Sequence, residues 1–300
     1  ILDIVGLETE HPELAEVPWL LFGHSSGGHW VLGMLRDYPE KILAAVCYSA
    51  AWDPQWDYTE AAENVPLLLR HAGKDDAPSC LCEATAIHTF GKLRKKNAPV
   101  AIAYNEGQNH NYSNVRHIAI PFFESAIKRR LTSRSGLRDV DKSGCYLADT
   151  LTLSIVKESE YEGDKSSMCR FLDKEIAEKW QEFVRTGDVA DVTPPDAPYA
   201  LSAVRLSTGG VKLTWHAEAD VESGIECFNI YLDGKLVRRV PEEGTYQAFD
   251  RNGDNAIPAK PVGMTLIMTN EPESKFVLSV ETVNQYGLSS KTASVTVKSK

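Results

Sequence analysis

The chain has 300 residues, of which 43% are hydrophobic and 25% are charged, so it is long enough to form two hydrophobic cores. The formal net charge of −10 gives no electrostatic reason to bind nucleic acid, because phosphate binding requires clustered lysine and arginine. No apolar run approaches the roughly 18 residues that a membrane span requires. We therefore expect two domains, no nucleic-acid partner and no membrane span.

The six cysteines do not follow a metal-binding pattern. Cys80 and Cys82 have one intervening residue rather than two, and no second pair lies at zinc-ribbon distance. Residues 250–254, DRNGD, lack the ligand spacing and closing glutamate of an EF-hand, which favours a polar turn. We expect no metal and no organic cofactor. The even number of cysteines leaves disulfides open.

The first part of the chain alternates between apolar runs and amphipathic segments. Residues 1–7 predict the end of a helix, and because the chain begins with Ile rather than Met, we expect further residues upstream. The predicted strands are residues 18–23, 42–49, 65–71 and 99–104, and the predicted helices are residues 28–38, 82–96 and 118–130. This order predicts an α/β domain over residues 1–131, with a mostly parallel sheet covered on both faces.

The remainder of the chain changes character twice. Residues 132–192 are mixed and charged, with one clear helix at 173–185, and we interpret them as a connector packed on the first domain. Residues 193–198, TPPDAP, predict a stiff linker. Beyond it, short runs alternate with period two and are separated by glycine turns, which predicts an antiparallel β-sandwich over residues 193–300.

The motif that carries chemistry is Gly23-His24-Ser25-Ser26-Gly27, which fits G-x-S-x-G between a predicted strand and a predicted helix. A hydroxyl must project from a sharp strand-to-helix turn to attack a carbonyl, and the flanking glycines permit that turn. We expect Ser25 to be a nucleophile. The main-chain N–H of Ser26, at the start of the helix, is then a candidate donor to the oxyanion.

The acid and the base are expected after later strands. The run at 65–71 is followed by Asp75 and Asp76, and the count along the strand favours Asp75 as the acid, with Asp76 as the alternative. The run at 99–104 is followed by His110, which we predict to be the general base. His24, Trp52 and Trp56 are candidates to line a substrate pocket, although ordinary packing explains the two tryptophans equally well.

On these residues, the first 130 or so positions resemble the C-terminal half of an α/β-hydrolase. Ser25, Asp75 and His110 match that family's nucleophile, acid and histidine in order and placement. The resemblance implies hydrolysis through an acyl-enzyme, most often of carboxylic esters, and is closer to secreted bacterial esterases than to proteases. The family has strands before the nucleophile, and a loop there supplies a second oxyanion donor; those strands are absent from this sequence.

The segment from about Pro194 resembles a fibronectin type III module. The resemblance rests on the proline-rich start of the module, on Leu213-Thr-Trp215 and on Phe228-Asn-Ile-Tyr231. Such modules act as spacers or binding surfaces, which implies a carbohydrate or protein contact. The module and the even cysteine count favour a secreted or periplasmic protein.

Three functional hypotheses remain at this stage. The leading one is a serine carboxylic-ester hydrolase that acts on a small or polymeric ester. A peptidase of the same fold differs from it in acyl-pocket and lid residues. A catalytically inert chain that binds through its β-sandwich is the alternative from another class.

Overall fold

The computed structural model describes residues 2–51, 56–74, 81–111, 114–133, 136–207, 209–246, 262–269, 272 and 274–299. Asp75, Asp76, Trp52, Cys80 and the turn at 250–254, all discussed above, lie outside these residues. The chain forms two compact units, Ile1–Val189 and Ala190–Lys300.

The first unit is built on a four-stranded parallel sheet with the strand order β1-β2-β3-β4. Its strands are β1 (Trp19–His24), β2 (Ile42–Tyr48), β3 (Leu67–Lys74) and β4 (Val100–Asn109). Every residue of β2 is buried, as expected for an apolar strand covered on both faces. The unit thus combines helices with a parallel sheet of four strands, which is consistent with the α/β class expected from the sequence.

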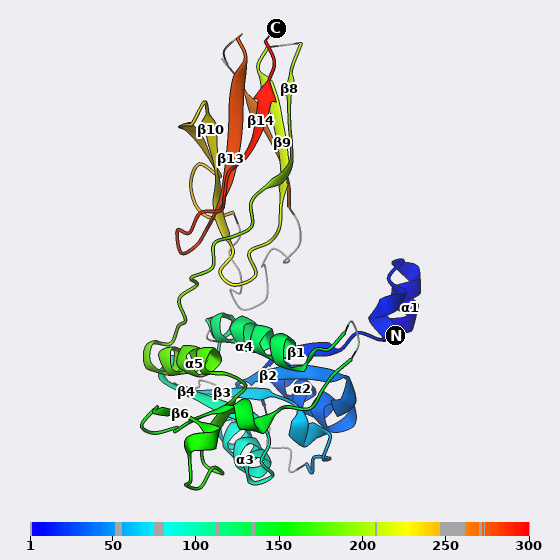
Figure 1. The fold of residues 1–300 in the computed structure, drawn as a ribbon, viewed down its shortest axis with the longest axis vertical. Helices are drawn as coiled ribbons and strands as arrows, with labels where there is room; N and C mark the ends of the chain where they lie inside the picture. Colours follow the sequence, from blue (N-terminus) through cyan, green and yellow to red (C-terminus); the bar gives the residue numbers. More distant parts are fainter. Residues whose placement is uncertain are drawn as a thin grey trace. The chain divides into compact units, whose positions relative to one another are not determined.

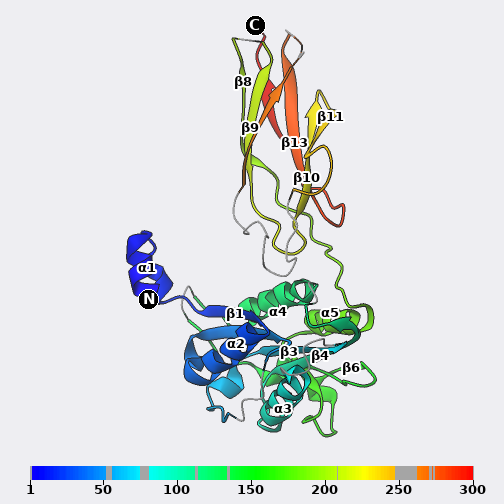
Figure 2. The same cartoon turned by 180° about the vertical axis from the view of Figure 1, so that it is seen from behind.

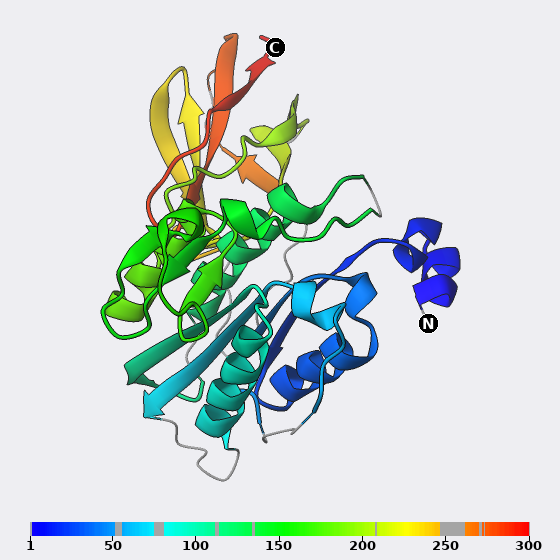
Figure 3. The same ribbon diagram turned by 60° about the horizontal axis from the view of Figure 1, so that its bottom comes forward.

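Helices cover both faces of this sheet (Figures 1 and 3). Figure 3 shows α2 (Ser26–Asp37) and α3 (Cys82–Lys95) on one face, with α4 (Val115–Arg130) and α5 (Lys174–Thr186) on the other. Helix α2 buries Val31, Leu32 and Leu35 against the sheet. The remaining helical elements are α1 (Leu2–Glu8) and short 3-10 turns at Pro12–Ala15, Pro39–Lys41, Ala62–Asn64, Lys142–Gly144 and Glu158–Glu160.

The predicted connector contains a small antiparallel sheet that the sequence did not reveal. Strands β5 (Tyr146–Ala148), β6 (Ile155–Lys157) and β7 (Cys169–Phe171) pair in the order β6-β5-β7. Phe171 and Trp180 belong to the same core as the parallel sheet, and the Trp180 indole donates to the Ile102 main-chain oxygen over 2.9 Å. Figure 2 shows β6 at the β4 end of the sheet.

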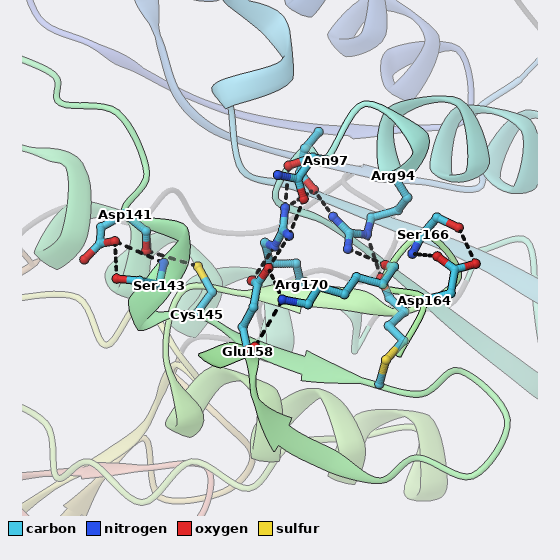
Figure 4. Close-up of polar contacts among 12 residues, drawn as sticks. Arg94, Asn97, Asp141, Ser143, Cys145, Glu158, Asp164, Ser166 and Arg170 are labelled. Atoms are coloured by element: carbon cyan, nitrogen blue, oxygen red, sulfur yellow. Dashed lines mark hydrogen bonds and ion pairs between the residues drawn. The ribbon is translucent and has the colours of Figure 1, made fainter. Parts of the chain in front are cut away.

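A buried polar cluster fastens this segment to the end of helix α3 (Figure 4). Arg170 is fully buried and pairs with both carboxylate oxygens of Glu158, with Nε 2.7 Å from Oε2. Its guanidinium also donates to the main-chain oxygen and side chain of Asn97. Beside it, Arg94 donates to main-chain oxygens such as that of Met168 at 2.6 Å. Burial, reinforced by the charge of Arg170, lowers the Arg94 pKa to about 10.

The second unit consists of two antiparallel sheets with the orders β11-β10-β13-β14 and β12-β9-β8. Trp215 and Phe228, from strands of different sheets, pack edge to face with ring centroids 5.4 Å apart in a shared core. The strands are β8 (Tyr199–Arg205), β9 (Val211–Ala217), β10 (Ile225–Leu232), β11 (Lys235–Val240), β12 (Val262–Met268), β13 (Phe276–Asn284) and β14 (Ala293–Val297).

The second unit begins ahead of the predicted proline-rich linker, because Asp191 is part of it. The Asp191 carboxylate accepts hydrogen bonds from the Ser223 hydroxyl at 2.7 Å and the Asn284 amide at 2.9 Å. These contacts attach residues before the linker to the loop before β10 and to the end of β13.

The five described cysteines, Cys47, Cys82, Cys145, Cys169 and Cys227, are buried and form no disulfide. Burial raises the pKa of Cys145 and of Cys169 to about 12, so both thiols stay protonated at neutral pH. No described helix has both the length and the hydropathy required to cross a lipid bilayer.

Candidate active site

Ser25 occupies the sharp turn between β1 and α2. Its backbone angles, φ 55° and ψ −118°, lie in a region that non-glycine residues rarely adopt. Its N–H donates to the Tyr48 oxygen at 3.1 Å, and its own oxygen accepts from Ala51 N at 3.0 Å. Main-chain bonds to the end of β2 and the loop beyond it therefore hold the unusual conformation. The Ser25 side chain is half-buried.

The two glycines of the motif have different roles. A Cβ atom on Gly23 would lie 2.3 Å from the main-chain oxygen of Gly27, so the strand and the helix cross too closely for any side chain there. A Cβ atom on Gly27 would meet nothing within 4 Å. The turn thus requires glycine at position 23, whereas position 27 is open.

Ser26 is the first residue of α2 and is exposed. The N–H groups in the first turn of a helix have no intrahelical acceptor, and the helix dipole favours negative charge beside them. The predicted oxyanion donor therefore lies at the positive end of a 12-residue helix, directly after the predicted nucleophile.

His110 follows the last residue of β4 and is buried. Strands β1 and β4 are at opposite edges of the sheet, yet the two segments meet here. The His24 Nε2 atom is 3.0 Å from the His110 main-chain oxygen, and the two imidazole rings have centroids 4.7 Å apart. The residue next to Ser25 therefore contacts the predicted base directly.

Cys82, the first residue of α3, also contacts His110. Its sulfur is 3.8 Å from His110 Nδ1 and donates to the Ser49 main-chain oxygen at 3.1 Å. Nothing in the sequence pattern indicated this contact.

The acid candidates lie outside the described residues, but the strand before them is described. Lys74, the last residue of β3, pairs with Asn109, the last residue of β4. In the sequence, Lys74 is followed by Asp75 and Asn109 is followed by His110. The described register thus brings Lys74 and Asn109, which precede the two predicted residues in the sequence, opposite each other.

The predicted pocket residues divide between two places. His24 stacks on Tyr48, with centroids 4.3 Å apart, at the position described above. Trp56 is partly buried against the core and contacts α2, with its ring 4.3 Å from the Arg36 guanidinium carbon and 4.9 Å from the His29 ring. The structure thus brings His24 into contact with His110 and packs Trp56 against helix α2.

Arg70 is a feature of this sheet edge that the sequence interpretation missed. It is 1% exposed and donates to three groups: Asn105 Oδ1 at 3.1 Å, Ser49 Oγ at 3.2 Å and the Asn109 main-chain oxygen at 3.2 Å. The signal was present as an arginine inside the mostly apolar run at 65–71. A buried charge must be hydrogen-bonded, which marks such a residue for attention.

No family model and no curated protein matches the chain. Among solved structures, a single-residue variant of SOBER1 from Arabidopsis thaliana is similar over 43% of this chain and 62% of its own, at 22% identity and a TM-score of 0.31. A structure titled FN3tt mut is similar over 35% of this chain and 97% of its own, at 20% identity and a TM-score of 0.23. The fibronectin(III)-like modules of CbhA from Clostridium thermocellum cover 33% of this chain and 93% of their own, at 16% identity and a TM-score of 0.21. These similarities are weak, and the match spans less than two thirds of the Arabidopsis protein.

Proposed function

We propose that the first unit is a serine hydrolase of the α/β-hydrolase type that cleaves carboxylic esters. The observation that carries this proposal is the contact between His24, at the end of edge strand β1, and His110, which follows the opposite edge strand β4. Ser25 has a strained conformation between β1 and α2, and its neighbour His24 donates to the His110 main-chain oxygen at 3.0 Å. A reactive hydroxyl needs both an exposed turn and a base that reaches it.

In the proposed reaction, His110 removes the proton from Ser25 Oγ as that oxygen attacks the ester carbonyl carbon. The oxyanion that forms is stabilised by the N–H of Ser26 at the start of α2. The C–O bond to the alcohol then breaks, and the alcohol leaves with the proton held by His110. Water, activated by the same imidazole, hydrolyses the acyl-enzyme and restores Ser25.

The acid is proposed to be Asp75, with Asp76 as the alternative. A carboxylate beside His110 would fix the tautomer of the imidazole and stabilise its protonated form. The pairing of Lys74 with Asn109 supports Asp75, because Asp75 and His110 directly follow these two residues in the sequence.

The second unit is proposed to be a fibronectin type III-like module that spaces the enzyme or binds a carbohydrate or protein. This proposal rests on the two antiparallel sheets and the Trp215–Phe228 core. A secreted or periplasmic location also stays a prediction.

A substrate panel tests the proposed activity and separates it from a peptidase. The full chain should hydrolyse p-nitrophenyl esters faster than aminoacyl amides of the same acyl groups. Ser25→Ala should reduce kcat by at least about 10⁴-fold. Ser26→Ala is the matched control, since it keeps the main-chain N–H and should retain most of the activity. Faster hydrolysis of the amides would indicate a peptidase, and no hydrolysis of either would favour a binding protein.

A further inference from the structure

Arg70 lies at the centre of the sheet edge that carries the proposed site, yet the proposed reaction assigns it no role. Its guanidinium is buried in β3, between β2 and β4. The three groups to which it donates belong to both neighbouring segments: Ser49 follows β2, whereas Asn105 and Asn109 belong to β4. One side chain therefore links the ends of three strands.

The contact with Asn109 is the informative one, because its oxygen belongs to the peptide bond that joins Asn109 to His110. Arg70 Nη1 donates to this oxygen at 3.2 Å. On the other side, the oxygen of His110 itself accepts from His24 at 3.0 Å. The peptide groups before and after His110 are thus held by two different side chains, one from β3 and one from β1.

The other two contacts of Arg70 fix the guanidinium in place. Asn105, which accepts from Arg70 Nε, donates through its own amide to the Phe183 oxygen of α5 at 3.1 Å. Ser49, which accepts from Nη1, donates its N–H to the Arg70 main-chain oxygen at 2.7 Å. Because both acceptors are anchored, the guanidinium is held rigidly where it donates to the Asn109 main-chain oxygen.

We propose that Arg70 is a positioning residue for His110. It holds the peptide before His110 so that the imidazole stays within reach of Ser25 Oγ, and it touches neither the substrate nor the reacting atoms. This inference rests on the proposed function. The guanidinium reaches these acceptors from two separate nitrogens, Nε toward Asn105 and Nη1 toward Ser49 and Asn109, whereas a lysine has all its donors on one nitrogen and cannot reproduce this spacing.

The test compares Arg70→Lys with Arg130→Lys in the full chain. Arg130 is also buried and donates to main-chain oxygens, but those belong to Arg138 and to Ile42 and Leu43 at the start of β2, the opposite end of the sheet. Both variants lose a buried guanidinium. Rates are measured per active site, titrated with a fluorophosphonate, so that unfolded protein does not contribute.

Arg70→Lys should lower kcat by about 10- to 100-fold, since small displacements of a catalytic group have effects of this size, with KM nearly unchanged. Arg130→Lys should keep the wild-type kcat per titrated site. Equal kcat values for Arg70→Lys and wild type, or equal losses in both variants, would overturn the proposal. If Arg70→Lys does not fold, Ser49→Ala removes one acceptor of Arg70, and it should lower kcat by roughly 3- to 10-fold; an unchanged kcat there would also overturn it.

Hydrogen–deuterium exchange tests whether Arg70 holds the segment before His110 independently of whether the chain is a hydrolase. Peptides that cover residues 105–111 should exchange faster in Arg70→Lys than in Arg130→Lys, whether or not the chain hydrolyses esters. A wild-type protein that the fluorophosphonate does not modify would refute the proposed function, and the exchange rates would then still show whether Arg70 holds this segment. Equal exchange in the two variants would overturn the holding role itself.

Discussion

His24 and His110 are 86 positions apart, and the side chain of the first donates a hydrogen bond of 3.0 Å to the main chain of the second. His24 also stacks on Tyr48 at the end of β2. The residue before the proposed nucleophile therefore contributes to holding the proposed base.

This relationship predicts the behaviour of His24→Phe. Phenylalanine keeps an aromatic ring against Tyr48 but loses the hydrogen bond to His110, which is worth about 1 kcal/mol. We expect kcat/KM for esters to fall roughly 5-fold. His29→Phe loses a comparable bond, to the Ala51 oxygen, without touching His110, and should have the smaller effect. Equal effects of the two substitutions would contradict the role given to His24.

The turn at Ser25 predicts that Gly23→Ala and Gly27→Ala behave differently. A methyl group on Gly23 would collide with the Gly27 main chain, so this variant should lose about 1–3 kcal/mol of unfolding free energy or more, together with its activity. Gly27 is in α2 with open space around it, and alanine there should stabilise the helix by about 0.5–1 kcal/mol. Urea unfolding of both variants measures these changes. A tolerated Gly23→Ala would show that the strand and helix do not approach as closely as described.

The assignment of the acid is tested by Asp75→Asn and Asp76→Asn. The variant that removes the acid should reduce kcat about 10⁴-fold, because the imidazole is left in the wrong tautomer. The other variant should stay within about 10-fold of wild type. We expect the larger loss for Asp75→Asn, and a larger loss for Asp76→Asn would reverse the assignment without refuting the enzyme.

The second unit contains a carboxyl group that predicts a pH effect on stability. Burial, reinforced by the nearby charge of Asp191, raises the pKa of Asp220 in the folded state. The folded chain then binds this proton more tightly than the unfolded chain. The contribution of Asp220 to stability is therefore fully present below its unfolded pKa of about 3.9 and is lost as the pH rises through the raised value.

Asp220→Asn should remove this dependence. Asparagine keeps an Oδ1 acceptor for the main-chain N–H groups of Ser223 and Glu222, which bind Asp220 at 3.0 and 3.1 Å. At pH 7 the melting temperature of the second unit should rise by roughly 2–4 °C, and at a pH of about 3.5 the variant and wild type should differ less. Calorimetry across this pH range measures the effect. The prediction would be contradicted if Asp220→Asn stabilised the second unit less at neutral pH than at acidic pH.

The sequence predicted the parallel sheet because each of its strands contains a continuous apolar run, whereas the segments between the strands have apolar residues at helical spacing. It placed the ends of two strands too early. Strand β3 continues to Lys74 and β4 to Asn109, whereas the predicted runs stop at residues 71 and 104. The extensions are polar and largely exposed, so they carry no apolar periodicity, and they are strands because they pair with each other.

The short elements were missed for a related reason. Strands β5, β6 and β7 have three residues each, which is too short for any period to be recognised. The contact between His24 and His110 was also beyond the sequence, because it depends on how the chain beyond β4 returns across two strands. What the pattern did provide was the order of Ser25, Asp75 and His110 along the chain.

The most direct test of the proposed enzyme is the site and extent of covalent modification by a fluorophosphonate, measured by mass spectrometry on the folded full chain. We expect one equivalent of phosphonyl group on Ser25, none in Ser25→Ala, and much slower labelling in His110→Ala. A folded chain that stays unmodified at Ser25, or that reacts equally fast without the His110 imidazole, would contradict the proposal.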